Sequence, residues 1–392
     1  MTQSDPPHNA SPIPRLAAYV DPLTGTEYPL DQPRWRSDTG APLMITPLPG
    51  MTRQDIDRGA RSLWRYAASL PLSVANPVSM GEGCTPLVKR PWRAGATAHC
   101  KLEYFAPTGS FKDRGASVMV SVLRQQRVDQ ILEDSSGNGG AAVAAYGALA
   151  GMKVKVLAPA STQPAKTVQA RIYGAEVELV AGSRQDTAAE AVRQAASIFY
   201  ASHNWQAFFL QGTKTLAYEL WEDLGFRAPD NVIIPTGAGS NVLGCDIGFS
   251  ELLRRGEIDR LPRLFAAQPE NCAPIHASFI SRREDLVPVA IKPTIAEGTA
   301  IACPVRLREV LQAIRRSKGG TVVLSEAEIL SALFELARMG LYAEPTSASA
   351  AAAFNRLLET GVILPHETTV LVLTGTGLKA TQRVGEFMSV FD

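Results

Sequence analysis

A lysine in an unusual setting occurs in the stretch "APTGSFKDRGAS", residues 106–117. Lys112 follows a turn-forming Pro-Thr-Gly-Ser segment, and Asp113 and Arg114 come directly after it. Most lysines are solvated surface charges, and that is the ordinary interpretation of a single lysine in a loop. A lysine acts as a nucleophile only when its amine is neutral, which requires a partly desolvated pocket. Such an amine can form a Schiff base with a carbonyl compound.

A glycine loop later in the chain could bind an anion. "PTGAGSN" contains Gly237, Ala238, Gly239, Ser240 and Asn241; it follows the apolar segment "VII" and precedes a predicted helix. Small residues let backbone N–H groups converge on an anion, and the start of a helix adds a positive dipole. Taken alone, the loop also fits a tight turn between a strand and a helix.

Two more loops offer polar groups of a similar kind. In "DSSGNGG", the side chains of Ser135, Ser136 and Asn138 could hold a carboxylate or a phenolic oxygen. In "TGTGLK", Thr374 could donate to or accept from a ring nitrogen. Each loop alone also fits a helix cap or an ordinary turn, so the information lies in the occurrence of all four loops together.

The four loops follow strands in a chain whose predicted strands and helices alternate. Strands are predicted over 98–105, 130–136, 153–160, 176–182, 231–235, 263–270 and 369–373, and helices over 115–126, 139–151, 163–174 and 186–199. This alternation is typical of an α/β protein with a mostly parallel sheet, in which ligands bind beyond the carboxyl ends of the strands. A lysine beside a phosphate-binding loop at that edge suggests pyridoxal 5'-phosphate, whose aldehyde takes the lysine and whose phosphate takes the loop.

Composition limits the classes of protein that remain. The chain has 392 residues, 45% of them hydrophobic and 20% charged, with a formal net charge of +1. This length favours two domains, and the balanced charge gives no reason to expect a nucleic acid or a membrane as partner. The five cysteines are scattered and never spaced as C-x-x-C, which favours a reducing compartment with free thiols. No apolar leader or membrane span is evident, so a cytoplasmic protein is expected.

Seven motifs in order resemble one family. They are "GEGCTPL", "KLEYFAPTGSFKDRG", "SSGNGGAAVAAYGALAG", "GTKTLAYEL", "PTGAGSN", "LYAEPTSASA" and "LTGTGLK". Over roughly residues 80 to 385 the chain resembles the fold-type II pyridoxal-phosphate enzymes, the group similar to the tryptophan synthase β chain, and within them the threonine synthases. The resemblance implies a two-domain α/β fold and an amino-acid substrate.

The resemblance also implies roles for individual residues. Lys112 would be the Schiff-base lysine and the catalytic acid/base, with Phe111 beside it at the cofactor. The other residues expected at the cofactor are Asn138 at its 3′ oxygen, Gly237, Ala238, Gly239, Ser240 and Asn241 at its phosphate, Thr374 at its ring nitrogen, and Glu344 nearby. Thr85, Ser135, Ser136, Asn138 and Lys166 would contact the substrate. No metal site is expected.

Several reactions remain open on this basis. The resemblance favours a carbon–oxygen lyase of the threonine synthase type, which eliminates phosphate from O-phosphohomoserine and adds water to give threonine. The alternatives are a threonine or serine ammonia-lyase and a β- or γ-replacement enzyme acting on a related activated amino acid. A ligand-binding sensor is disfavoured, because a sensor does not need a Schiff-base lysine.

The chain departs from the family pattern in two regions. Residues 16–45 resemble a zinc ribbon, but Asp21, Thr24, Ser37 and Thr39 stand where four cysteines are expected. A structural zinc site is implausible without thiolates, so the module is expected to persist without metal.

The second departure concerns the substrate. Ala302, in "EGTAIACPVR", stands where the resemblance would place an arginine, and Gly139 stands where threonine is usual. A dianionic phosphate needs cationic donors, and Lys166 and Arg306 are the candidates for replacing the lost one.

The expected organisation has four parts. Residues 1–15 form a disordered tail and residues 16–45 a degenerate zinc-ribbon-like extension. Residues 46–115 and 211–392 form the large cofactor-binding domain, and residues 116–210 form a smaller mobile domain. By analogy with the family, a homodimer is expected.

Overall fold

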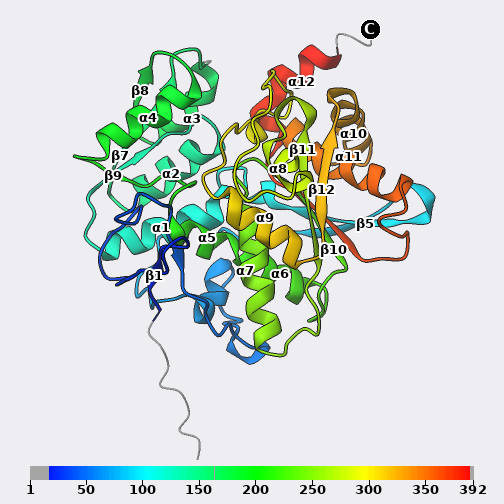
Figure 1. Cartoon of the computed structure of the whole chain (residues 1–392), viewed down its shortest axis with the longest axis horizontal. Helices are drawn as coiled ribbons and strands as arrows, with labels where there is room; N and C mark the ends of the chain where they lie inside the picture. The colour runs from blue at the N-terminus through cyan, green and yellow to red at the C-terminus, as the bar shows by residue number, and fades with distance from the viewer. Residues whose placement is uncertain (1–16, 163, 389–392) are drawn as a thin grey trace, which may run out of the picture.

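The structure is a computed structural model that describes residues 17–162 and 164–388. The predicted tail over residues 1–15 lies outside the described residues. Two parallel sheets form the body of the protein, one on each side of the view in Figure 1, and the α/β class predicted from the sequence is confirmed.

The larger sheet has the strand order β12-β11-β10-β13-β5-β4. Its strands are β4 (Leu87–Pro91), β5 (Thr97–Leu102), β10 (Asn231–Pro235), β11 (Arg263–Pro269), β12 (Gly320–Leu324) and β13 (Thr369–Leu373). All neighbours pair in parallel except β4, which is antiparallel to β5 at the edge. The smaller sheet is wholly parallel, with the order β8-β7-β6-β9. Its strands are β6 (Gln130–Glu133), β7 (Lys153–Pro159), β8 (Glu176–Val180) and β9 (Phe199–Tyr200).

Helices cover both sheets. They are α1 (Lys112–Gln125), α2 (Asn138–Leu149), α3 (Pro164–Ile172), α4 (Arg184–Gln194), α5 (Ala207–Thr213), α6 (Thr215–Asp223), α7 (Ser240–Arg254), α8 (Pro274–Ile280), α9 (Leu307–Arg316), α10 (Glu326–Arg338), α11 (Pro345–Glu359) and α12 (Thr381–Met388). None of the helices in the described parts of the chain is long and apolar enough to cross a membrane.

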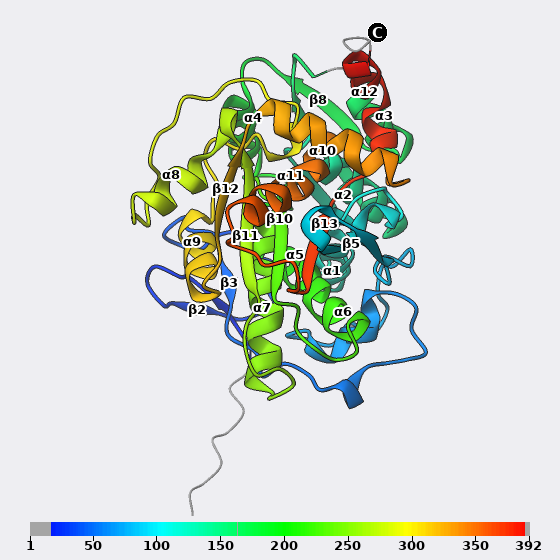
Figure 2. The same ribbon diagram turned by 90° about the vertical axis from the view of Figure 1, so that its right-hand side faces the viewer.

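The strands of the larger sheet are apolar on both faces, as expected for a buried parallel sheet. In β10, Ile233 packs in the core shared with α10 and α11, whereas its neighbours Val232 and Ile234 pack in the core shared with α7 and α9. Figure 2 shows α10 and α11 lying across one face of this sheet. The period of two along each strand thus divides the hydrophobic residues between two helical layers.

A buried ionic cluster, the Arg114 cluster, anchors the first turn of α1. The Arg114 guanidinium donates to Glu103 at 2.7 Å and to Glu219 at 2.9 Å, and all three side chains are buried. Lys101 joins the cluster at 2.6 Å from both Glu219 and Asp223. Because Arg114 is two residues after Lys112, this cluster fixes the lysine relative to β5 and α6.

The N-terminal extension forms a small antiparallel sheet of β1 (Tyr19–Val20), β2 (Glu27–Tyr28) and β3 (Met44–Ile45), with β1 in the middle. The four positions at which the resemblance places cysteines are linked by hydrogen bonds. Asp21 accepts from the Thr39 hydroxyl at 2.7 Å and from the Thr24 amide at 3.4 Å, and Ser37 bonds to Thr39 at 2.8 Å. Burial opposes these bonds, but together they lower the pKa of Asp21 to about 2.

One predicted helix is too long. The sequence predicted a helix over 186–199, but α4 ends at Gln194, and Phe199 begins β9, which pairs with Ile131 and Leu132 of β6. Ladder hydrogen bonds and the burial of Tyr200 against the sheet outweigh the local helical pattern. Strand β12 was also not predicted, although Gly319 and Gly320 form a turn signal directly before its apolar residues.

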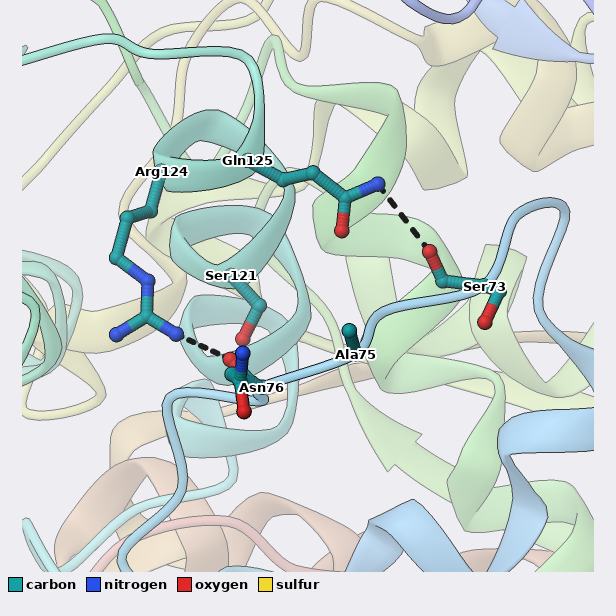
Figure 3. Close-up of a pocket in the computed structure, with 6 residues that line it drawn as sticks. All are labelled: Ser73, Ala75, Asn76, Ser121, Arg124 and Gln125. Atoms are coloured by element: carbon teal, nitrogen blue, oxygen red, sulfur yellow. Dashed lines mark hydrogen bonds between the residues drawn. The ribbon is translucent and has the colours of Figure 1, made fainter.

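A surface cavity of about 380 Å³ lies at the far end of α1 from Lys112. Figure 3 shows Arg124, Gln125 and Ser121 of α1 facing the segment from Ser73 to Asn76, with Arg124 and Gln125 donating hydrogen bonds to this segment. Because α1 rises about 1.5 Å per residue, this cavity is roughly 15–20 Å along the helix from the lysine, and it is separate from the loops around Lys112.

Candidate active site

Three of the four loops follow neighbouring strands. Strands β10, β13 and β5 are adjacent and parallel, so the segments after Pro235, Leu373 and Leu102 leave the sheet at the same edge. The loops after β13 and β5 are joined directly, because the Phe111 amide donates to the Thr374 carbonyl at 3.0 Å and the Thr376 amide donates to the Gly109 carbonyl at 3.1 Å. The sheet thus brings the lysine loop and the threonine loop into contact.

The turn before Lys112 is fixed by the next residue. The Asp113 carboxylate accepts from the Thr108 amide at 2.6 Å and also from the Thr108 hydroxyl. Burial raises the pKa of Asp113 to about 7, although the bonds from Thr108 oppose this. The sequence "PTGSFKD" therefore folds as a turn closed by its own aspartate, and α1 begins at the lysine.

Lys112 is half-buried among aromatic rings. Its Nζ atom lies 4.8 Å from the centre of the Phe111 ring and 5.7 Å from that of Phe209. Loss of hydration lowers the pKa of Lys112 to about 7 from the ordinary 10.5; Glu133 opposes the shift, and Arg184 adds to it. A large fraction of the amine is thus neutral at physiological pH, which is the state that a nucleophilic lysine requires.

Asn138 connects the smaller sheet to the C-terminal loops. It begins α2, and its amide nitrogen lies 3.2 and 3.3 Å from the two carboxylate oxygens of Glu344, while its amide oxygen accepts from Lys379 at 3.0 Å. Burial raises the pKa of Glu344, and Asn138, Lys379 and Lys112 oppose this rise. The structure therefore brings together two predicted residues, Asn138 and Glu344, and adds a lysine that sequence reasoning left without a role.

The Thr374 hydroxyl is buried and faces another hydroxyl. Its Oγ1 lies 3.1 Å from Oγ of Ser347, which accepts from the Gly375 amide at 2.8 Å and donates to the Gly375 carbonyl at 3.0 Å. Since Ser347 already donates to a carbonyl, it accepts from Thr374 or leaves the Thr374 hydroxyl free to turn toward a ligand. No charged group takes part in this pair of hydroxyls.

The glycine loop forms the start of α7. Gly239 is the residue before the helix and has φ of 91°, a conformation that favours glycine, and a Cβ atom there would overlap the side chain of Val310. Asn241, in the first turn, is 3% exposed, and both polar atoms of its side chain lack a hydrogen-bond partner within the described residues. Buried amides of this kind are almost always bonded, so the first turn of α7 has donors suited to a bound anion.

Helix α5 links the glycine loop to the lysine. It packs against both α1 and α7, and its Thr213 hydroxyl lies 3.1 Å from the Ser240 carbonyl, while its Phe209 ring lies beside Lys112. Gly237 and Ala238, which are also predicted to bind the phosphate, form the loop between β10 and this helix start.

The loop after β6 supplies the predicted carboxylate-binding residues. Ser135 is buried and Ser136 is half-buried, and Asn138 follows them at the start of α2. His203 lies next to this loop, and its Nδ1 is 2.9 Å from the carboxylate of Glu133. Sequence reasoning missed His203, because it lies 70 residues after Glu133 in the chain.

Two predicted substrate residues are already engaged in other bonds. The Thr85 hydroxyl is bound within the Arg114 cluster, at 2.7 Å from Glu103 and 3.2 Å from Glu219, and Thr85 is 5% exposed. Lys166, in α3, is exposed and pairs with Glu297 at 2.5 Å. The Thr85 hydroxyl and the Lys166 amine, which were predicted to contact the substrate, are thus bound to carboxylates of the protein. Their roles at the substrate stay predictions.

The profile of the family described as "Pyridoxal-phosphate dependent enzyme" matches residues 78–375. The chain belongs to this family of pyridoxal-phosphate-dependent enzymes. It is 37% identical over 326 residues to the threonine synthase of Methanocaldococcus jannaschii, covering 81% of this chain and 80% of that protein. It is 33% identical over 310 residues to the threonine synthase of Mycobacterium tuberculosis, covering 77% and 84%.

Solved structures show the same fold. The L-serine ammonia-lyase from Rhizomucor miehei has a TM-score of 0.69 at 21% identity, covering 78% of this chain and 98% of that one. The processed threonine deaminase isoform 2 of Solanum lycopersicum has a TM-score of 0.68 at 22% identity, covering 78% and 83%. At these identities the likeness concerns the fold alone.

The residues present fit the cofactor of this family. Lys112 has a largely neutral amine for the aldehyde, the start of α7 with Asn241 has unpartnered donors for the phosphate, and Thr374 has a hydroxyl for the ring nitrogen. These assignments stay predictions, and variants of the glycine loop and the pH dependence of cofactor uptake can test them.

The Gly239→Ala variant is expected to bind pyridoxal phosphate more weakly, because a Cβ atom overlaps Val310 and the φ of 91° is unfavourable for alanine. Holding alanine at this φ alone costs about 1–2 kcal/mol. If the loop changes conformation to avoid this cost, the loss in affinity is roughly five- to thirty-fold. Gly256→Ala is the matched control, since its φ is 72° but open space surrounds it. Cofactor titration of the apoproteins measures the effect, and equal affinities in the two variants would contradict the assignment of this loop to the phosphate.

Uptake of pyridoxal phosphate by the apoprotein is expected to accelerate with rising pH, with a midpoint near pH 7 rather than 10.5. The reason is that only the neutral amine attacks the aldehyde, and Lys112 is neutral above its pKa. Arg184→Gln should move the midpoint upward because Arg184 lowers this pKa, and Glu344→Gln should move it downward because Glu344 raises it. Stopped-flow absorbance follows the reaction, and shifts of the same sign in both variants would contradict this electrostatic account.

Proposed function

We propose that the protein is a carbon–oxygen lyase of the threonine synthase type, which releases phosphate from O-phosphohomoserine and adds water to give threonine. One observation carries the proposal: relatives that are 33 to 37% identical over about four fifths of this chain are named threonine synthase. The ammonia-lyase alternative is weaker, because its support comes from solved structures whose likeness is mainly one of fold.

The side chains suit an elimination. When bound, pyridoxal phosphate supplies an electron sink for negative charge at the substrate α carbon. Lys112, released from the cofactor, would accept the α proton at Nζ, since its pKa of about 7 allows it both to take up and to return a proton near neutral pH. The neutral Thr374 hydroxyl would leave the ring nitrogen unprotonated, which favours elimination over transamination.

The phosphate of the substrate requires a cation, and Arg306 does not supply it. Its guanidinium is buried and donates to three backbone carbonyls: Leu43 at 2.8 Å, Trp205 at 2.6 Å, and Asn204. Burial lowers its pKa to about 10. These bonds disfavour Arg306 as a replacement for the arginine lost at Ala302, because both terminal nitrogens of the buried guanidinium are bound to backbone carbonyls.

Arg184 is a better candidate than Arg306. It is the first residue of α4, directly after the loop that leaves β8, so it lies at the same edge of the smaller sheet as Ser135. It is half-buried and has no hydrogen bond or ion pair within the described residues, and its charge acts on Lys112, Glu133 and Asp134. An unpaired guanidinium at this edge suits a dianionic substrate group.

Arg184→Gln is expected to raise KM for O-phosphohomoserine by about 10- to 100-fold, since a hydrogen bond to a charged group contributes about 1.5–3 kcal/mol. The kcat should change less, because the contact is present in the ground state. Arg171→Gln, at the end of α3, is the control. Steady-state kinetics measure both constants, and an unchanged KM in Arg184→Gln would remove this residue from the substrate site.

The function is tested by incubating the holoenzyme separately with O-phosphohomoserine, threonine, serine and O-acetylserine. Phosphate and threonine formed from the first substrate alone are the expected result. A 2-oxo acid formed from threonine or serine, without threonine synthesis, would replace the proposal with an ammonia-lyase. New amino acids formed from O-acetylserine and an added nucleophile would indicate a replacement enzyme.

We also propose that the N-terminal extension is a zinc ribbon in which hydrogen bonds have taken over from the metal. The bonds among Asp21, Thr24, Ser37 and Thr39 support this, because the four expected ligand positions meet at one point of the small sheet. Replacing all four by cysteine should create a site that binds one Zn²⁺ per chain, which mass spectrometry under native conditions can detect; no binding would contradict the proposal.

We propose in addition that residues 116–210 form a mobile domain. We also propose that the protein acts as a homodimer and that it works in the cytoplasm. The separate smaller sheet over residues 130–200 supports the first point, and the free cysteines support the last. Light scattering of the holoenzyme tests the dimer, for which a monomer at all concentrations would be the contrary result.

A further inference from the structure

The imidazole of His203 occupies the space that a side chain at residue 139 would need. A Cβ atom at Gly139 would lie 2.6 Å from Cε1 of His203, 2.7 Å from its Nδ1, and 3.0 Å from Oγ of Ser135. The ring of His203, from the segment after β9, therefore fills the space that a side chain would need at Gly139 in the first turn of α2. The ring thereby borders the loop that is proposed to hold the substrate.

Glu133 orients this ring. The carboxylate of Glu133 accepts from the backbone amides of His203 at 3.0 Å and of Asp134 at 3.1 Å, and it lies 2.9 Å from Nδ1 of the ring. When it is ionised, this carboxylate already receives two N–H donors and is also the acceptor in the third contact, so Nδ1 then carries the proton and Nε2 has a free lone pair. Within the described residues, Nε2 has no hydrogen-bond partner.

The ring lies beside the lysine pocket. The centres of the His203 and Phe209 rings are 5.7 Å apart, and the same Phe209 ring lies 5.7 Å from Nζ of Lys112. The charged groups that act on His203 from the surrounding elements are Lys112 of α1, Asp134 after β6 and Arg184 of α4, together with its partner Glu133.

These surroundings keep the imidazole neutral. Burial and the positive charge of Lys112 hold the pKa of His203 well below its ordinary value, against the effect of Asp134 and with a further contribution from Arg184. Burial also raises the pKa of Glu133 to about 7, opposed by the His203 amide and by Lys112. Above pH 7, then, Glu133 is the acceptor for Nδ1–H; below it, a protonated Glu133 donates to Nδ1 and places the ring proton on Nε2.

We propose that His203, oriented by Glu133, is a second acid–base group of this site and takes the proton from the water that adds to the substrate. In this step the O–H bond of water breaks and its oxygen bonds to the β carbon of the unsaturated substrate. The electron pair of the carbon–carbon double bond moves to the α carbon, and the proton of water forms an N–H bond at Nε2. The ionised Glu133 stabilises the resulting imidazolium. The inference rests on the proposed function, and it divides the proton transfers between two bases, with the α proton at Lys112 and the water proton at His203.

The test uses the holoenzyme with O-phosphohomoserine. It measures the rate of phosphate release and compares the amounts of threonine and 2-oxo acid that form afterwards. His203→Gln is expected to release phosphate within a few-fold of the unsubstituted rate but to form threonine about 100-fold or more slowly, because one acid–base group contributes about 10²- to 10⁴-fold. The unsaturated intermediate would instead hydrolyse to 2-oxo acid and ammonia. His276→Gln, a half-buried histidine in α8 whose Nδ1 bonds to Thr321 at 2.8 Å, is the matched control and should keep threonine as the product.

A measurement on the unsubstituted protein keeps the proposal testable if His203→Gln does not fold. Nitrogen NMR of the histidines in the apoprotein should show His203 neutral, protonated at Nδ1 above pH 7 and at Nε2 below it. A proton on Nε2 at all pH values would overturn the proposal. In His203→Gln, an unchanged ratio of threonine to 2-oxo acid would overturn it too, and so would an equal loss of phosphate release and threonine formation. If the unsubstituted enzyme releases no phosphate, the proposed function fails instead, and the NMR result still reports on the His203–Glu133 pair.

Discussion

Replacement of Lys112 by alanine is expected to abolish covalent binding of pyridoxal phosphate and to reduce turnover by at least about 10²- to 10⁴-fold, the contribution of one acid–base group. The structure gives the reason: this amine is half-buried beside Phe111 and Phe209, and its pKa is lowered to about 7. Visible absorbance of the reconstituted protein and the rate of phosphate release measure the two effects.

The control for this experiment is Lys153→Ala, an exposed lysine at the start of β7, which should keep both the colour and the activity. After borohydride treatment and denaturation, the Lys112→Ala protein should also yield no peptide that carries the reduced cofactor. A Lys112→Ala protein that stays coloured through a covalent bond to another lysine would contradict the assignment of the anchor.

Replacement of Arg114 by methionine is expected to lower the free energy of unfolding by about 3–5 kcal/mol, because it leaves carboxylates without their buried partner. Glu103 and Glu219 are fully or almost fully buried, and each lies within 3 Å of the guanidinium. Lys101 still pairs with Glu219 in this variant, so the carboxylate of Glu103 loses the most electrostatic stabilisation. Denaturant unfolding monitored by circular dichroism measures the change.

Arg93→Met is the matched control, since Arg93 pairs with Glu335 and Glu359 at 3.1 Å but its side chain is 43% exposed. Exposed pairs contribute about 0–1 kcal/mol, so this variant should remain close to the unsubstituted protein. Equal losses in the two variants would show that burial does not decide the strength of the Arg114 cluster.

The loops could be predicted from the sequence because their signals are local. The turn before Lys112, the glycine at residue 239 and the hydroxyl at residue 374 each come after an apolar strand, and neighbouring parallel strands bring the loops at their carboxyl ends to one edge of the sheet. The closeness of the lysine and threonine loops is a consequence of that rule. Local patterns and sheet geometry together were sufficient to predict which loops meet at this edge of the sheet.

The remaining site residues could not be predicted, because they depend on packing between distant segments. Nothing near His203 in the sequence shows that its ring fills the space above Gly139, although the glycine itself was a visible departure. Arg306 follows the altered stretch around Ala302, which suggested a role in binding phosphate, but its donors bind backbone carbonyls of other segments. Charge and position along the chain do not reveal whether a guanidinium is already bound.

Arg306 has a consequence for how the protein unfolds. Its guanidinium joins the carbonyl of Leu43 in the N-terminal extension to those of Asn204 and Trp205 beyond the smaller sheet, while its own backbone directly precedes α9 on the larger sheet. Separating any one of these parts would expose these carbonyls and the buried guanidinium. The extension and the two sheets are therefore expected to melt as one cooperative unit, with a single calorimetric transition rather than stepwise detachment of the short N-terminal sheet.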